Sequence, residues 1–447
     1  MSNLKFPQGF TWGVSSSAFQ IEGAVTEDGR GATIWDRFCE TPGHIADGGN
    51  AEVACDHYHR YREDVGLIAG LGVDAYRFSI AWSRIQPNGK GAPNQVGLDF
   101  YSRLVDCLLE HGIEPTPTLF HWDLPQALQD AGGWHARDTT ARFAEYVGHV
   151  ADALGDRVPR WITQNETFEH AVLGHALGVH APGETHGLAI FDVVHHLLLS
   201  HGLAVQVLRA ATPATARIGI AQSMQRARPA GHRLRDRLAA WMLDTVHDNM
   251  HIDPLLLGRY PRGLLLLHQD RSALHDGDLA IISQPIDFLG VNFYNPQYVR
   301  AADKGSDIPI EEAEPPAQFA RTAMGWPVDP TGLTEVLHGL RKRYGRKLPP
   351  VIITENGAAF DDSVDAQGGI DDPQRIDYLR RHLETLHQAM NDGIDVRGYF
   401  VWSITDNFEW AEGYRPRFGL VHIDYASGKR TVKASYRWLR DLMAAQA

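Results

Sequence analysis

The sequence contains little cysteine. Cys39, Cys55 and Cys107 are the three cysteines in 447 residues, and they form neither a C-x-x-C pair nor a zinc-binding spacing. An odd number of widely spaced cysteines argues against a disulfide framework and is typical of proteins kept in a reducing compartment. We therefore expect a cytoplasmic location.

Long apolar runs and an excess of basic charge are lacking as well. The densest aliphatic stretch, residues 263–267, is far shorter than the ~20 residues that cross a bilayer. No charged segment followed by an apolar one precedes the strand-like sequence at residues 6–13, so we expect no signal peptide. The 42 basic residues are outnumbered by 55 acidic ones, for a net charge of −13. This balance disfavours nucleic acids and membranes as partners and is compatible with an uncharged small-molecule substrate; it leaves the oligomeric state open.

Several catalytic signatures are missing. No G-x-G-x-x-G follows the first strand-like run, and no G-x-S-x-G follows a strand. The chain has 23 histidines, but none in an H-E-x-x-H arrangement, and the groups His57/His59 and His195/His196/His201 lack a matching carboxylate. We therefore expect neither a cofactor nor a catalytic metal.

Eight strand-like runs alternate with helix-length segments. This alternation indicates βα units and a parallel sheet, and eight units in one chain favour a closed (β/α)8 TIM barrel over a doubly wound open sheet. No Ser/Gly-rich or Pro-rich linker divides the chain, so residues 1–447 are predicted to form one domain. The runs are Phe10–Val14, Ala75–Ser79, Glu114–Leu119, Trp161–Thr163, Arg217–Ala221, Phe288–Asn292, Val351–Glu355 and Val396–Trp402.

Long loops follow several of these strands, among them Ala301–Met324 and Phe360–Arg375. In a barrel, such loops form the mouth of the active site, so both are candidates for walls of a substrate channel. Ordinary solvated connections are the alternative for most of their residues.

Two glutamates stand at the ends of strand-like runs, within Thr163-Gln164-Asn165-Glu166 and Ile353-Thr354-Glu355-Asn356-Gly357. Barrel closure would bring both to the edge of the sheet where parallel folds place their chemistry. Two carboxylates around one bond are what glycoside hydrolysis needs. A single glutamate in this position is more often part of a structural salt bridge, so the pairing carries the hypothesis.

Further motifs accompany the two glutamates along nearly the whole chain. They are Phe6-Pro7-Gln8-Gly9-Phe10, Arg77-Phe78-Ser79-Ile80-Ala81-Trp82-Ser83-Arg84, His121-Trp122-Asp123-Leu124-Pro125, His180-Ala181-Pro182-Gly183, Trp402-Ser403-Ile404-Thr405-Asp406-Asn407-Phe408-Glu409-Trp410 and Tyr414-Arg415-Pro416-Arg417-Phe418-Gly419-Leu420. In these motifs and their order the chain resembles glycoside hydrolase family 1, the retaining β-glucosidases and β-glycosidases.

The resemblance implies a role for individual residues. Glu355 would be the nucleophile and Glu166 the general acid/base, with Arg77 supporting the nucleophile together with Tyr294. Trp402 would be the platform under the sugar ring, and Trp326 would wall the leaving-group subsite. Further sugar contacts are implied for Gln20, His121, Trp122, Asn165, Asn292, Glu409 and Trp410. For the tryptophans, packing in the core is the alternative.

The implied function is that of a β-glucosidase that releases terminal non-reducing β-D-glucosyl residues through a glycosyl-enzyme intermediate. A 6-phospho-β-glycosidase is one alternative, disfavoured because the Glu409 carboxylate would repel a 6-phosphate. A sugar-binding relative without activity is the other, disfavoured because both glutamates are present. The chain departs from the family pattern at Thr167, where proline is usual, at Phe168 in place of tryptophan, and at Gln222-Ser223.

Overall fold

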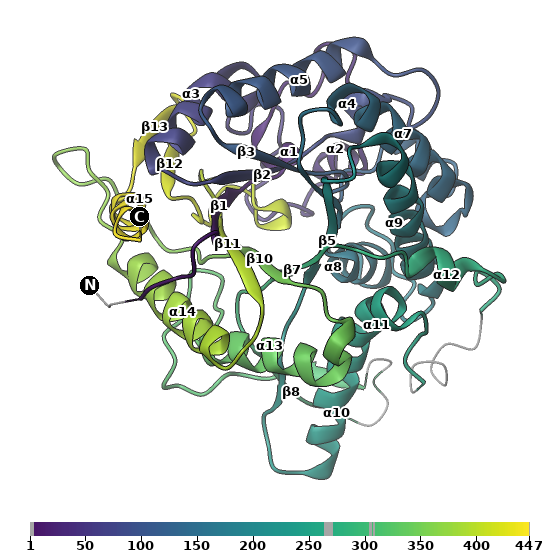
Figure 1. Ribbon diagram of the computed structural model, residues 1–447. Coiled ribbons are helices and arrows are strands. Elements are labelled where there is room, and N and C mark those ends of the chain that lie inside the picture. The colour runs from purple at the N-terminus through teal and green to yellow at the C-terminus, as the bar shows by residue number, and fades with distance from the viewer. Residues whose placement is uncertain (1–3, 263–270, 304–305, 307–308, 447) are drawn as a thin grey trace.

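Eight parallel strands close into a barrel in the computed structural model, which describes residues 4–262, 271–303, 306 and 309–446 (Figure 1). Neighbouring strands follow the order β1-β2-β3-β4-β5-β7-β10-β11 and return to β1. The eight predicted strands and the predicted TIM barrel are confirmed, with strand ends that differ by up to two residues. The strands are β1 (Thr11–Ser15), β2 (Ala75–Ser79), β3 (Glu114–Thr118), β4 (Arg160–Asn165), β5 (Arg217–Ser223), β7 (Phe288–Asn292), β10 (Val351–Asn356) and β11 (Val396–Trp402).

Helices surround the barrel and cover its outer face (Figure 1). They are α1 (Ala18–Ile21), α2 (Ile34–Glu40), α3 (His57–Leu71), α4 (Trp82–Ile85), α5 (Gln95–Glu110), α6 (Gln126–Gln129), α7 (Asp138–Leu154), α8 (Thr167–Ala171), α9 (Phe191–Ala211), α10 (Leu234–Asp244), α11 (Met250–Leu257), α12 (Asp278–Ile282), α13 (Thr331–Tyr344), α14 (Pro373–Asn391) and α15 (Ala434–Ala444). Short helical turns lie at η1 (Gly133–His135), η2 (Val172–Ala176), η3 (Thr245–Asn249), η5 (Gly345–Lys347) and η6 (Trp410–Glu412).

Two small sheets stand outside the barrel. Strands β12 (Val421–Asp424) and β13 (Lys429–Val432) form an antiparallel pair, and β6 (Ala227–Pro229), β8 (Gln297–Ala301) and β9 (Ile310–Glu312) form a three-stranded sheet. The predicted loop Ala301–Met324 therefore contains a strand, because β9 pairs with β8. The aliphatic stretch at residues 263–267 lies outside the described residues.

Helix α9 has the length and the apolar composition of a membrane span, with 21 residues and a mean hydropathy of 1.3. Within the fold, however, 78% of its most apolar window is buried, since it packs against α7, α12 and the neighbouring strands. Burial of most of its residues explains the apolar composition of this helix, whereas its last turns carry exposed residues such as Gln206 and Arg209.

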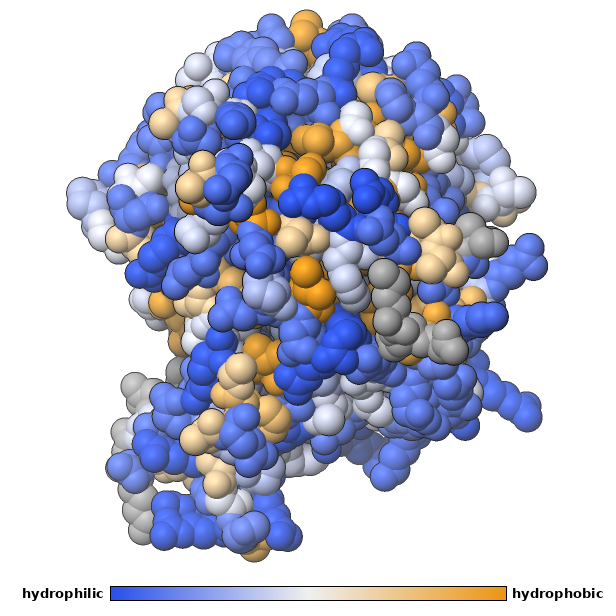
Figure 2. All heavy atoms as spheres, turned by 90° about the vertical axis from the view of Figure 1, so that its left-hand side faces the viewer, coloured by the Kyte–Doolittle hydropathy of each residue, from blue (hydrophilic) through white to orange (hydrophobic). Residues whose placement is uncertain are grey.

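The first and last described segments lie on the same side of the molecule, where β1 pairs with β11 and closes the barrel (Figure 1). Seen from that side, the surface is mainly hydrophilic, with apolar residues in small groups (Figure 2). Hydrophilic side chains therefore dominate this face, as expected for polar groups that are costly to bury without partners.

Strands β4 and β10 lose their regular register near their carboxyl ends. The pairing of β4 with β5 shifts between Ile162 and Asn165, and that of β10 with β7 shifts between Ile353 and Glu355. Irregularities of this kind change the direction of the side chains that follow. Both predicted catalytic glutamates come directly at or after such a shift.

Candidate active site

A cavity of about 330 Å³ opens at the carboxyl ends of the strands. It is lined by most of the residues that the resemblance implied: His121, Trp122, Glu166, Asn292, Tyr294, Trp326, Glu355, Trp402, Glu409 and Trp410. Phe418 and Met324 also line this cavity. The structure therefore brings these ten residues together, and their individual roles remain predictions.

Glu355 lies within β10 and is held by donors on both carboxylate oxygens. Arg77 on β2 donates from Nη1 to Oε1 over 2.5 Å, and the Tyr294 hydroxyl donates to Oε2 over 2.6 Å. Burial and the nearby Glu355 charge raise the pKa of Tyr294 well above its ordinary value, so the phenol keeps the proton that it donates. A guanidinium and a phenol thus compensate the charge of this carboxylate.

Glu166 follows β4 directly and has the opposite surroundings. Burial, followed by the charges of Glu355 and Glu169, raises its pKa well above that of an ordinary glutamate. Asn292 on β7 donates from Nδ2 to Glu166 Oε1 over 2.8 Å. Burial and the neighbouring carboxylates therefore favour the protonated form of Glu166, which is the form that a general acid requires.

A chain of amides joins the two glutamates. Asn165 Oδ1 accepts from Arg77 Nη2 over 2.6 Å and from Asn292 Nδ2 over 2.9 Å. Its own Nδ2 lies 3.0 Å from His121 Nε2. Burial and the charge of Arg77 lower the pKa of His121 well below its usual range, so this imidazole is neutral.

Gln20, Arg77 and Asn165 are not among the residues that line the cavity; they lie behind it. Gln20 donates from Nε2 to Glu409 Oε2 over 3.4 Å and to the Phe408 carbonyl over 3.0 Å. The Gln20 amide, for which a sugar contact is predicted, thus donates to groups of the protein in this structure. Its side chain positions Glu409.

Aromatic side chains enclose the other sides of the cavity. The rings of Trp122 and Trp410 lie 4.7 Å apart, and those of Tyr294 and Trp326 lie 5.5 Å apart. Trp402 is almost fully buried and packs with Phe418. Apolar faces beside amide and carboxyl groups are the combination that a pyranose ring requires, because its hydroxyls lie on the rim and its C–H groups on the faces.

Three lining residues have left-handed backbone angles: Trp122 (φ 75°), Glu166 (φ 48°) and Trp410 (φ 50°). Such angles are uncommon for residues other than glycine and concentrate at functional sites. Glu166 adopts this angle directly after β4, whereas Trp122 and Trp410 adopt it within the segments that follow β3 and β11.

Besides Glu312 and Glu412, sequence reasoning missed the lining carboxylate Glu169. It lies on α8, three residues after Glu166, and accepts from Ser223 Oγ over 2.9 Å while forming an ion pair with His247 over 3.5 Å. Hydrogen bonding to Asp248 and Glu169 raises the pKa of His247 to about 10 despite burial. The sequence could have indicated this residue, because a glutamate three positions after the predicted acid lies on the same side of a helix that begins there.

The departures from the family pattern belong to one network. The Thr167 backbone N–H and hydroxyl each donate to Gln222 Oε1 over 3.0 Å, and the hydroxyl also lies 2.7 Å from His251 Nδ1. Phe168 packs on the ring of His247 at 4.0 Å. The two unusual segments, 167–168 and 222–223, are therefore in direct contact at the carboxyl ends of the neighbouring strands β4 and β5.

The predicted loop Phe360–Arg375 does not contribute to the cavity lining, whereas Ala301–Met324 does, through Glu312 and Met324. Phe360–Arg375 instead carries a buried ionic cluster: Arg375 pairs with Asp362 over 2.8 Å and with Asp372. The expectation of a wall is thus met by one of the two loops.

Comparison with known proteins agrees with this geometry. The family model "Glycosyl hydrolase family 1" matches residues 2–447. "Beta-glucosidase A" of Acetivibrio thermocellus is 45% identical over 447 residues, covering 99% of both chains. A "Bifunctional beta-D-glucosidase/beta-D-fucosidase" of Bifidobacterium breve is 44% identical, covering 98% of both.

Solved structures give the same result. A family 1 β-glucosidase from Thermotoga maritima superposes with a TM-score of 0.94 at 42% identity, covering 100% of this chain and 99% of that one. The Thermotoga maritima enzyme in complex with deoxynojirimycin has a TM-score of 0.94 at 43% identity, covering 99% of both chains. The chain therefore belongs to glycosyl hydrolase family 1.

Proposed function

We propose that this protein is a retaining β-glucosidase that releases terminal β-D-glucosyl residues from glucosides and short oligosaccharides. The observation that carries the proposal is the contrast between the two carboxyls of the cavity. Glu355 accepts hydrogen bonds from a guanidinium and a phenol, whereas burial and neighbouring carboxylates raise the pKa of Glu166 and so favour its protonated form. Relatives named β-glucosidase support the substrate class.

The geometry supports a double displacement. Glu166 transfers its proton to the glycosidic oxygen while a Glu355 oxygen attacks the anomeric carbon, so the alcohol leaves and a glycosyl ester forms. Esterification removes the charge of Glu355, and this lowers the pKa of Glu166. Glu166 then accepts a proton from water while the water oxygen attacks the anomeric carbon and the bond from that carbon to Glu355 breaks. Glu355 leaves as a carboxylate, Glu166 is protonated again, and two inversions at the anomeric carbon retain its configuration.

The lining disfavours phosphorylated sugars. It contains six glutamates and, among the described residues, neither lysine nor arginine; the glutamates are Glu166, Glu169, Glu312, Glu355, Glu409 and Glu412. Burial and the charges of Glu355 and Glu412 raise the pKa of Glu409 to about 8, so this residue alone carries little charge at neutral pH. We therefore attribute the exclusion of a 6-phosphate to the lining as a whole, because its described residues include several glutamates and no lysine or arginine that could bind the phosphate.

The decisive experiment removes each glutamate and adds azide. For Glu355→Ala we expect kcat on an aryl β-glucoside to fall on the order of 10⁴- to 10⁶-fold, the scale on which loss of a nucleophile acts in other hydrolases. Azide should restore turnover and give an α-glycosyl azide, because the small anion enters from the vacated face. For Glu166→Ala the azide product should have the β configuration.

Two outcomes would contradict the assignment: a β-azide from Glu355→Ala, or full activity of Glu166→Ala without azide. Glu312→Ala, which removes a carboxylate from the exposed rim of the same cavity, is the matched control and should retain activity. A sugar-binding protein without hydrolytic activity would give no turnover with the wild-type chain.

The preferred glycone is tested with a panel of nitrophenyl β-glycosides. The Bifidobacterium breve relative is named for both glucosidase and fucosidase activity, so we propose that glucosides and fucosides are both accepted. Plain and 6-phosphorylated glucosides compared side by side decide the alternative activity. A cytoplasmic location stays a prediction, supported by the three free thiols.

A further inference from the structure

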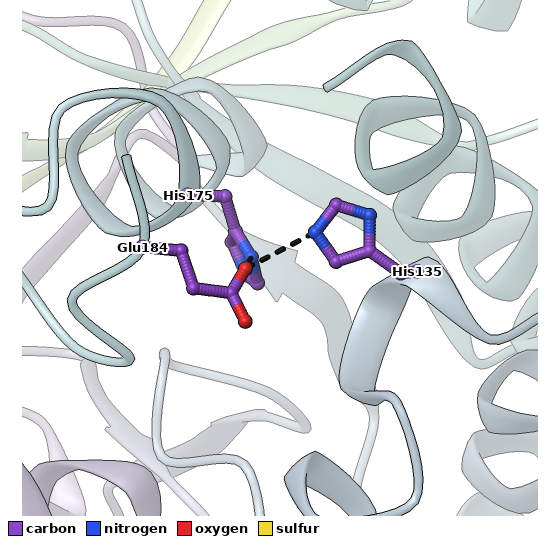
Figure 3. Close-up of side chains that lie close together, drawn as sticks. All are labelled: His135, His175 and Glu184. Atoms are coloured by element: carbon purple, nitrogen blue, oxygen red, sulfur yellow. Dashed lines mark hydrogen bonds and ion pairs between the residues drawn. The ribbon is translucent and has the colours of Figure 1, made fainter. Parts of the chain in front are cut away.

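A cluster of histidines and a glutamate lies outside the active-site cavity, on the loops that follow β3 and β4. His135 comes from η1, His175 from η2 and Glu184 from the connection to α9. Their potential ligand atoms all lie within 4.8 Å of one another. Figure 3 shows the three side chains pointing toward a common centre from separate segments. None of the three lines the active-site cavity.

The spacing of these atoms is close to that of metal ligands. Glu184 Oε2 lies 2.6 Å from His175 Nδ1 and 3.1 Å from His135 Nε2. His186 Nε2 lies 3.4 Å from the same oxygen but outside the group of three mutually close ligands, so its imidazole would have to move to become a fourth ligand. Zinc–ligand bonds of about 2.0–2.2 Å put neighbouring tetrahedral ligands roughly 3.3 Å apart, so the closest pair would need to separate by well under an ångström.

Outer partners orient the ligand atoms. Asp192 Oδ2 lies 2.7 Å from His135 Nδ1 and thereby directs Nε2 toward the cluster. Gln129 donates to the second oxygen of Glu184 over 2.8 Å, leaving Oε2 for the histidines. A carboxylate behind a ligating histidine is the usual outer arrangement of protein zinc sites.

The chemistry of the ligands selects the ion. Three imidazoles and one carboxylate suit Zn²⁺ and other first-row transition ions, whereas Ca²⁺ and Mg²⁺ require six or more oxygen ligands. His175 is buried, while His135 and Glu184 retain side-chain exposures of 27% and 26%, which leaves a path for entry. We propose that His135, His175, Glu184 and His186 bind one Zn²⁺-type ion.

The position of the site defines its role as structural. His180, on the connection between His175 and Glu184, lines the active-site cavity and lies 5.7 Å from the ring of Trp122. An ion bound by this cluster would join the segment that carries His180 to the segment that leads into α7. The proposed ion takes no part in glycoside hydrolysis, so its test is independent of the proposed activity.

Calorimetric titration of the full-length, untagged chain with ZnCl₂ after EDTA treatment tests the proposal. We expect one ion per chain, no competition from excess Mg²⁺, and a rise in Tm on addition of zinc. Asp192→Asn keeps an acceptor for His135 but removes the charge, and should weaken zinc binding about 10- to 100-fold. His135→Gln and Glu184→Gln remove ligands and should weaken it further.

His59→Gln is the matched control. His59 also contacts two carboxylates, Asp56 over 2.6 Å and Glu27 over 3.1 Å, but has no second histidine in that group. Its removal should leave zinc affinity and the zinc-dependent rise in Tm unchanged. Absence of saturable binding by the wild type would overturn the proposal, as would equal affinity of His59→Gln, Asp192→Asn and Glu184→Gln. Circular dichroism in EDTA identifies any variant that fails to fold, and the remaining variants then decide.

Discussion

Glu169 controls its neighbour Glu166 through charge. It is among the groups that raise the pKa of Glu166, and Ser223 and His247 hold it in place within the lining. The sequence alone marks Glu166 through its strand and motif, but the effect of Glu169 depends on burial, which becomes visible only when the barrel is assembled.

Neutralising this side chain should shift the pH profile. In Glu169→Gln the acid loses a nearby negative charge, so the pKa of Glu166 falls. Because the acid must be protonated to act, the alkaline limb of kcat/KM should move to lower pH, by on the order of one unit. The measurement is kcat/KM against pH with an aryl β-glucoside.

Glu312→Gln provides the comparison for this shift. It makes the same change of charge at an exposed position of the cavity, and Glu312 is not one of the principal groups that raise the pKa of Glu166. Its alkaline limb should stay in place. A shift of equal size in both variants would mean that Glu169 acts only through the net charge of the lining.

At the scale of single elements, α8 begins in an unusual way. Thr167 is its first residue, a position where proline is favoured in helices generally, yet here the backbone N–H and the hydroxyl both donate to Gln222. The residue types at 167 and 222 therefore depend on each other, although 55 positions separate them.

Thr167→Pro should therefore destabilise the protein. It removes both donors and leaves the buried Gln222 oxygen without them, at a cost of about 1–3 kcal/mol. The restriction of the unfolded chain by proline offsets about 0.4–1 kcal/mol of this. We expect a net loss of about 1–2 kcal/mol, measured by denaturant titration.

Thr167→Ser is the control for the proline variant, because it retains the N–H and the hydroxyl and should lose little stability. A Thr167→Pro variant as stable as the wild type would show that the contact with Gln222 contributes nothing net. The effect on activity is a separate readout, since α8 carries both Glu166, as its cap, and Glu169.

The elements that sequence predicts well are those with a local signal. Several barrel strands, such as β10, are rich in apolar, β-branched residues, and every strand end was located to within two residues. The contact of Thr167 with Gln222 and that of His135 with Glu184 could not be predicted, because each joins residues about 50 positions apart in the sequence. Loop contacts are determined by the closed barrel and leave no periodic pattern in the sequence.

At the scale of the whole molecule, a buried ionic cluster connects the carboxyl-terminal segment to the barrel. Lys433 precedes α15 and pairs with Asp406 over 2.7 Å and with Asp362. Arg375 pairs with Asp362 and Asp372, so the cluster joins three distant parts of the chain. All of these side chains are almost fully buried.

Removing Lys433 should unbalance this cluster. Lys433→Met leaves Asp406 and Asp362 with fewer cations in a dry environment, and breaking a buried pair in this way costs about 3–5 kcal/mol. We expect a marked fall in Tm by calorimetry. Lys429 is an exposed lysine on the neighbouring strand β13, so Lys429→Met should leave Tm nearly unchanged. If both substitutions lowered Tm equally, the buried cluster would not stabilise the protein.

The bridge from Asn292 to Glu166 determines which oxygen of the acid carries the proton. Arg77 can only donate, so it fixes the Asn165 oxygen as an acceptor, and Asn292 must then present its N–H₂ group to Asn165 and to Glu166 Oε1. An oxygen that accepts this bond is a poor place for the proton, which therefore resides on Oε2. The proton is thus delivered from Oε2 of Glu166 and not from Oε1. Arg77 determines this choice through Asn165 and Asn292, although it does not contact Glu166.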